Sequence, residues 1–196
     1  DWADPYRGER ITRVIESKEK FNIKEMLELQ VDYYSIPSEQ IINLSTGLIF
    51  NNIEYFSMLE KWDKKLSKSS IEAGIYIEWQ NQLIQEINKK FIPEKVKNYI
   101  SMQLFTVIDK ISKMNAKDRK ELLNQTFNSS IDNLKEKFGE NPDNWVYGQQ
   151  DFKYVKIYHP LEKVVKDSIR EIIGLKSYPR GGDGYTPGST SNSFNQ

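Results

Sequence analysis

Apolar residues recur at helical spacing along most of the chain. In the longest stripe every fourth residue is apolar, and its members are Ile71, Ile75, Trp79, Leu83, Ile87 and Phe91. Side chains four residues apart lie on one face of an α-helix, so this stripe predicts a long amphipathic helix with one buried face. Shorter stripes of the same period occur within residues 11–15, 23–34, 58–66, 96–111 and 123–138. The pattern therefore predicts a mainly α-helical body.

Residues that start and stop helices sharpen this prediction at two places. Pro93 suits the first turn of a helix, where its missing N–H is not needed, so a helix is expected over about 93–111. Asn115, with Asp118 three residues later, is typical of an N-terminal cap. Gly139 is a matching C-terminal stop. A second helix is therefore expected between Asn115 and Gly139.

The pattern changes after residue 140. Residues 141–144 (Asn-Pro-Asp-Asn) have turn chemistry, and the aromatic and β-branched residues that follow predict short strands at about 145–158. A last amphipathic helix is expected from about Leu161 to Ile173, with Gly174 as its stop.

The end of the chain builds loop rather than helix. Four of the ten glycines fall between Gly181 and Gly188, and polar residues follow. Glycine lets a chain pass close to a ligand or to another backbone, so this loop is either a tight turn or a ligand-binding loop, and the tight turn is favoured. We expect a helical domain over 1–178 and an extended glycine-rich tail over 179–196.

Composition and charge exclude several classes of protein. The chain has 28 basic and 28 acidic residues, so no net field attracts it to nucleic acid or to an anionic membrane. No apolar run approaches the roughly 20 residues that span a bilayer. The absence of cysteine excludes disulfides, thiolate zinc sites and a cysteine nucleophile. The first four residues, Asp-Trp-Ala-Asp, do not have the pattern of a signal peptide, and the cell compartment stays open.

Few side chains suggest chemistry by themselves. His159 is the only histidine, which favours a packed structural role over catalysis and leaves no partner for a metal site. Asp32, Asp63 and Asp183 are candidates for acid–base work, but no two of them pair at a meaningful spacing, so caps or exposed charges are favoured.

Tryptophan and arginine positions are also better explained by structure when taken alone. Trp62 and Trp79 lie on apolar stripes and are expected in the core. Arg7, Arg10 and Arg13 lie three residues apart on one helix face, which is typical of a solvated charged face. These residues do not indicate a self-sufficient active site, and no cofactor site is expected in this chain.

Five segments, in the right order, resemble the β-subunit of the penicillin acylase (penicillin amidase) family. They are Trp2 with residues 4–11 (Asp-Pro-Tyr-Arg-Gly-Glu-Arg-Ile), residues 21–26 with 29–32 and Ser35, the set Leu59, Trp62, Asp63, Ser70, Ala73 and Trp79, the set Trp145, Tyr147-Gly148 and His159-Pro160-Leu161, and residues 181–186 (Gly-Gly-Asp-Gly-Tyr-Thr). Together they cover nearly the whole chain.

The resemblance implies an N-terminal nucleophile hydrolase that cleaves its own precursor into α and β chains. Such enzymes hydrolyse acyl amides, namely β-lactam side chains, N-acyl-homoserine lactones or other N-acyl amines. Their nucleophile is an N-terminal serine with its own α-amino group as base, and an asparagine stabilises the oxyanion. Because this chain begins with Asp1, we expect it to be an internal helical part of the β-subunit that is inactive by itself.

The resemblance also assigns partners and one site residue. Arg10 resembles the family arginine that lines the active site and helps to orient substrate and the oxyanion asparagine. The expected partners are the α-subunit and the rest of the β-subunit, with a small-molecule amide as substrate. The parent enzyme is expected to be exported, and several relatives hold a structural calcium whose ligands lie mostly outside this span.

Two other functions stay open at this point. One is a non-catalytic helical interaction module with Gly181–Gln196 as a flexible linker. The other is a helical domain that binds a small ligand through the glycine-rich loop.

Overall fold

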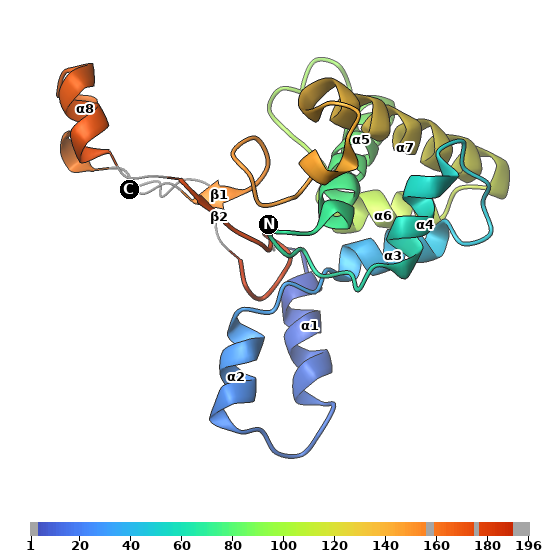
Figure 1. The fold of residues 1–196 in the computed structure, drawn as a ribbon. Helices are drawn as coiled ribbons and strands as arrows, with labels where there is room; N and C mark the ends of the chain where they lie inside the picture. Colours follow the sequence, from blue (N-terminus) through green and yellow to red (C-terminus); the bar gives the residue numbers. More distant parts are fainter. Residues whose placement is uncertain (1–3, 156–158, 175–176, 190–196) are drawn as a thin grey trace.

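The computed structural model describes residues 4–155, 159–174 and 177–189. The fold is mainly helical, and Figure 1 shows a helical body, a projecting helical hairpin and a thin extension that carries the last helix. The helices are α1 (Tyr6–Ile15), α2 (Ile23–Gln30), α3 (Ile36–Leu44), α4 (Ile53–Lys61), α5 (Ile71–Phe91), α6 (Leu104–Ser112), α7 (Ala116–Phe138) and α8 (Asp167–Ile173). Two 3₁₀ turns lie at Pro142–Asn144 and Pro160–Lys163, and a two-stranded antiparallel ribbon pairs β1 (Tyr154–Val155) with β2 (Tyr178–Pro179).

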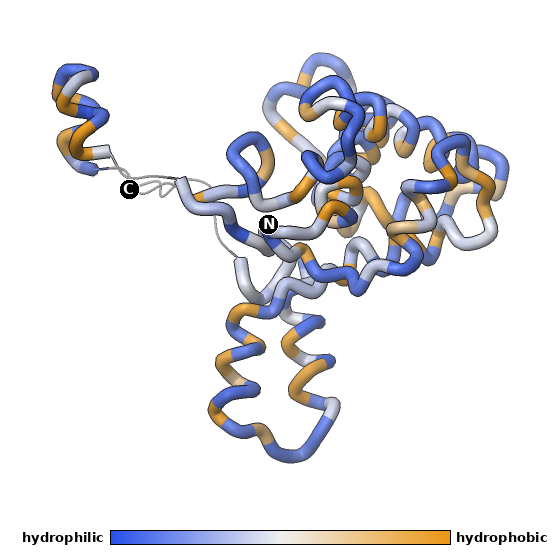
Figure 2. Tube along the Cα trace, in the orientation of Figure 1, coloured by the Kyte–Doolittle hydropathy of each residue, from blue (hydrophilic) through white to orange (hydrophobic). Residues whose placement is uncertain are grey.

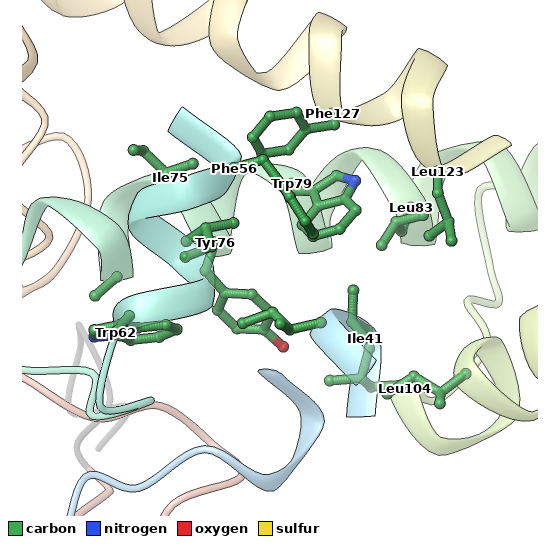
Figure 3. Packing of buried hydrophobic residues seen from close by; sticks show 14 of the residues in the cluster. Ile41, Phe56, Trp62, Ile75, Tyr76, Trp79, Leu83, Leu104, Leu123 and Phe127 are labelled. Carbon is green, nitrogen blue, oxygen red and sulfur yellow. The ribbon is translucent and has the colours of Figure 1, made fainter. Parts of the chain in front are cut away.

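The core lies where α5 packs along α7. Trp79 is fully buried there, and its ring meets Phe127 edge to face at 5.0 Å between centroids. Phe50 and Phe56 stack at 4.0 Å between centroids, and Phe56 meets Trp79 edge to face at 6.1 Å. Figure 3 shows Phe56, Trp79 and Phe127 in this cluster. The indole N–H of Trp79 donates to Thr126 Oγ1 at 3.0 Å, which satisfies the polar atom of this buried ring. The long apolar stripe therefore forms the predicted helix.

Capping residues set the ends of the two long helices. Ser70 Oγ accepts the Ala73 N–H at the start of α5, and Asn115 Oδ1 accepts the Asp118 N–H at the start of α7. Gly139 follows α7 with a φ of +84°, a backbone conformation that favours glycine. The predicted boundaries of α7 are confirmed.

The prediction of a helix that begins at Pro93 is wrong. The chain forms turns after α5, and the next helix, α6, begins only at Leu104. Val96 and Ile100 are exposed, so neither of these apolar positions packs on the core. The first turn of α6 is instead capped from a distance, because Asp4 accepts the backbone N–H groups of Leu104 and Phe105 at 3.0 and 3.3 Å.

The region predicted to hold strands at 145–158 is mostly loop. Tyr154 and Val155 form the only strand there among the described residues, whereas Trp145 and Tyr147 are buried side chains on irregular backbone. Residues 156–158 lie outside the described residues.

The last helix is shorter than predicted. Residues 160–163 form a 3₁₀ turn, and α8 begins at Asp167. Val164 and Ile172 are about four-fifths exposed, at 78% and 82%, so the amphipathic pattern does not face a core. Figure 2 shows apolar positions along α8 and along both helices of the α1–α2 hairpin. Within the described ranges no helix has the length and apolar character needed to cross a membrane.

Candidate functional site

Three distant segments of the chain meet at the base of the α1–α2 hairpin. Residues 32–35 pair with residues 64–66, because the Ser35 N–H donates to the Lys64 carbonyl and the Leu66 N–H donates to the Tyr33 carbonyl, each at 2.9 Å. The glycine-rich loop, residues 181–188, joins them through its own backbone bonds. Figure 1 shows this junction beneath the helical body, where α1 and α2 leave it.

Arg10, the residue assigned by resemblance, lies at this junction. Its Nε donates to Asp32 Oδ2 at 2.6 Å, and its guanidinium carbon lies 4.4 Å from the centre of the Tyr34 ring. The second carboxylate oxygen of Asp32 accepts the Tyr34 N–H at 3.0 Å. The Arg10 side chain is 23% exposed and the Asp32 side chain 12%, so this ion pair is largely shielded and held in one geometry.

The other two arginines of the α1 face have different partners. Arg7 donates to the carbonyl of Gly184 at 2.8 Å, which attaches α1 to the glycine-rich loop. Arg13 bonds Glu9 and Glu39, and the hydrogen bond to Glu39 is the main cause that raises the pKa of this guanidinium. A solvated charged face therefore does not describe Arg10, which is largely shielded. Arg7 is exposed, as expected of such a face, but it makes a contact far along the sequence.

A hollow of about 500 Å³ opens between α1 and α2 next to the ion pair. Its lining combines apolar and charged side chains: Arg10, Val14, Phe21, Leu29, Asp32 and Lys65 among others. A mixed lining of this kind suits a ligand with an apolar part and a polar group to orient.

The glycine-rich loop packs closely against the ring of Tyr33. A Cβ atom added to Gly181, Gly182 or Gly188 would lie 2.7–2.8 Å from that ring, which is closer than side chains approach. Gly182 also has a φ of +71°. The loop is thus a tight turn around a side chain of the same protein, and its described part, residues 181–189, is packed rather than a flexible linker.

Asp183 is buried within this loop. Its Oδ1 accepts the Tyr185 N–H at 2.8 Å, and Oδ2 has no hydrogen bond within the described ranges. Burial raises the pKa of Asp183 to about 6, although the Tyr185 N–H and the charge of Lys153 act against this shift. Burial also lowers the pKa of Lys153. Asp183 is therefore neither an exposed charge nor an ordinary cap.

The remaining candidates have local structural roles. His159 is exposed, contrary to the expectation of a packed side chain, and its Nδ1 accepts the Leu161 N–H at 3.2 Å. Asp63 Oδ1 accepts the Lys65 N–H at 2.9 Å. Trp62 and Trp79 are buried as predicted. No three His, Asp or Glu side chains gather into a metal-ligating group in the part of the chain that the structure describes.

Sequence reasoning did not identify Tyr33 and Tyr34 as parts of the site. Tyr33 fills the glycine-rich loop and Tyr34 lies under the Arg10 guanidinium. The sequence offers no clear signal for either role, because both depend on contacts with residues far along the chain.

Comparison with known proteins identifies the lineage. No curated protein matches the chain. The model of the family described as penicillin amidase matches residues 1–196, the whole chain. The ordered blocks, the helical fold and this match agree, and the chain belongs to the penicillin amidase family, a lineage of hydrolases.

Proposed function

We propose that this chain forms one wall of the acyl-binding cleft in an enzyme that hydrolyses acyl amides. The observation that carries the proposal is Arg10, held by Asp32 and Tyr34 at the edge of a hollow of mixed polarity. The nucleophilic serine and the oxyanion asparagine are supplied by other segments of the same precursor.

Arg10 acts by orientation in this proposal. Asp32 accepts from the Nε of Arg10, and neither Nη group donates a hydrogen bond within the described ranges, so the end of the guanidinium can donate to a ligand. A planar donor fixed by a carboxylate and an aromatic ring loses little freedom when it binds a carbonyl or a side-chain amide. Donors fixed in advance stabilise the charge that develops on the scissile carbonyl oxygen.

The side chains that line the hollow indicate which class of substrate would fit it. Val14, Phe21 and Leu29 offer apolar contacts for an acyl group, and Arg10 and Lys65 offer donors for its polar end. We propose N-acylated amines as the substrate class, with β-lactam side-chain amides and N-acyl-homoserine lactones as members to be tested.

The test uses the product of the complete gene and a chromogenic phenylacetyl anilide. We expect hydrolysis by the complete enzyme and none by the isolated chain of 196 residues. Arg10→Lys keeps the charge but removes the Nε donor and the planar group, so kcat/KM should fall by about 100-fold. Arg13→Lys, on the same helix and in an exposed ion pair, should change kcat/KM less than about 3-fold. Turnover by the isolated chain, or full activity of Arg10→Lys, would refute the proposal.

An interaction module is the second candidate, because α2 and the residue directly after it expose an apolar stripe. Ile23, Leu27 and Val31 lie four residues apart and are 81%, 56% and 57% exposed. Such a stripe fits a protein partner, and under the main proposal that partner is the rest of the precursor. A complete gene product that forms complexes but hydrolyses no acyl amide would favour the module.

A further inference from the structure

The glycine-rich loop is bonded to the backbone of the residue that holds Arg10. The Gly188 N–H donates to the Asp32 carbonyl at 2.9 Å, and the Gly182 N–H donates to the Leu66 carbonyl at 2.8 Å. Leu66 in turn donates to the Tyr33 carbonyl at 2.9 Å. The loop backbone is therefore bonded to Asp32 directly, and to Tyr33 through Leu66.

Three glycines, which we call the contact glycines, make this closure sterically feasible: Gly181, Gly182 and Gly188. A Cβ at Gly181 would lie 2.5 Å from the Leu66 carbonyl oxygen, and one at Gly188 would lie 2.8 Å from the backbone carbonyl carbon of Val31. Gly184, in the same loop, has open space where its Cβ would be. Absence of a side chain is thus required where the loop meets residues 31–33, and not at the loop tip.

Two polar side chains, one from the loop and one from outside it, bond the loop backbone. The Tyr147 hydroxyl donates to the Gly182 carbonyl at 2.9 Å, and the fully buried Thr186 accepts the Asp183 N–H through Oγ1 at 3.0 Å. A loop held in this way fixes the position of the Asp32 backbone, to which it is hydrogen-bonded.

We propose that the contact glycines position Arg10 through Asp32, with Gly188 as the direct link. Displacement of Gly188 removes the hydrogen bond to the Asp32 carbonyl and moves the Asp32 carboxylate, which in turn releases the Nε of Arg10 from its 2.6 Å bond. The effect on catalysis rests on the proposed function, whereas the effect on Arg10 does not.

The first experiment compares Gly188→Ala with Gly184→Ala in the isolated chain. The readout is the ¹⁵Nε–H resonance of Arg10 and its exchange with water, because a hydrogen-bonded and shielded Nε–H exchanges slowly. Gly188→Ala should shift this resonance and speed its exchange at least 10-fold, and Gly184→Ala should leave both unchanged. Thr186→Val is a second variant in case Gly188→Ala fails to fold. It loosens the loop without adding bulk, and it should change the resonance and the exchange rate of the Arg10 Nε–H in the same direction by a smaller amount.

The second experiment measures hydrolysis by the complete gene product with the same substitutions. Gly188→Ala should lower kcat/KM by about 100-fold, the loss expected for a displacement of about 1 Å at a reacting group. Asp32→Asn and the double variant complete a cycle, and the double variant should lose no more than the worse single variant, because both act on Arg10.

The outcomes separate the two proposals. An unchanged Arg10 resonance in both Gly188→Ala and Thr186→Val, or losses in the cycle that multiply, would overturn the positioning role. A displaced Arg10 with full hydrolytic activity would support the positioning role and contradict the proposed function.

Discussion

Asp183, in the glycine-rich loop, should make the stability of the chain depend on pH. Its carboxyl group is buried, one of its oxygens has no hydrogen bond among the described residues, and burial raises its pKa to about 6 from an ordinary value of 3.8. The folded state therefore favours the neutral acid. The stability that Asp183 contributes is present below the ordinary pKa and is lost as the pH rises through about 6.

We expect Asp183→Asn to remove this pH dependence. Two units of pKa correspond to about 3 kcal/mol, so the free energy of unfolding of the wild-type chain should fall by up to that amount between pH 4 and pH 7 from this group. The variant should lack this decrease. Urea unfolding at a series of pH values measures it.

Asp143→Asn is the matched control, because Asp143 is exposed in a 3₁₀ turn. This control should keep the pH profile of the wild type. A profile that Asp183→Asn leaves unchanged would show that the carboxyl is already solvated.

Residue identities alone could locate the candidate site only in part. Arg10 follows from the resemblance, but its pairing with Asp32 spans 22 residues and depends on how residues 32–35 pair with residues 64–66. The glycine-rich loop was recognisable as a close approach, since glycine permits one. Which glycines need to be glycine is a property of the fold, because a Cβ at Gly184 would meet nothing, whereas a Cβ at Gly188 would meet the Tyr33 ring.

At the scale of elements, the two helical glycines of α1 and α5 differ in surroundings. Gly8 has open space at its Cβ position, whereas a Cβ at Gly74 would lie 1.9 Å from the carbonyl oxygen of Trp145. Gly74 thus allows the loop around Trp145 to lie directly on α5.

Gly8→Ala and Gly74→Ala should therefore change stability in opposite directions. Alanine favours helix over glycine, so Gly8→Ala should raise the free energy of unfolding by about 0.5–1 kcal/mol. Gly74→Ala should lower it by about 1–3 kcal/mol, because Trp145 has to move. Denaturant unfolding of both variants checks this, and equal effects would contradict the packing of Trp145 on α5.

Helices with both a periodic stripe and local caps could be predicted from the sequence. The apolar stripes of α5 and α7 pack against each other, and Ser70 and Asn115 cap the starts of these helices. The start of α6 could not be predicted, since its cap is Asp4, 100 residues away in sequence. Periodicity also misled at Val164 and Ile172, because an apolar stripe does not tell whether a core faces it.

At the scale of the whole molecule, the described surface carries apolar groups that the chain itself does not cover. Leu27 on α2 is 56% exposed, whereas Leu29 on the same helix is 7% exposed. Under the proposed function the exposed stripe contacts the rest of the precursor.

Leu27→Lys and Leu29→Lys distinguish a residue that contacts the rest of the precursor from one that stabilises the chain itself. Leu27→Lys should change the free energy of unfolding of the isolated chain by less than about 0.5 kcal/mol, because its side chain is already in water. It should lower the yield of assembled enzyme from the complete gene. Leu29→Lys should destabilise the isolated chain itself, since a charge is buried. Wild-type assembly of Leu27→Lys would exclude this face as the contact.

The most direct test of the account is a crystal structure of the enzyme made from the complete gene, with a phenylacetate product bound. We expect the Arg10 guanidinium within hydrogen-bond distance of the product or of the oxyanion asparagine, with the bond from its Nε to Asp32 intact. A product bound elsewhere, with Arg10 directed to solvent, would contradict the central claim.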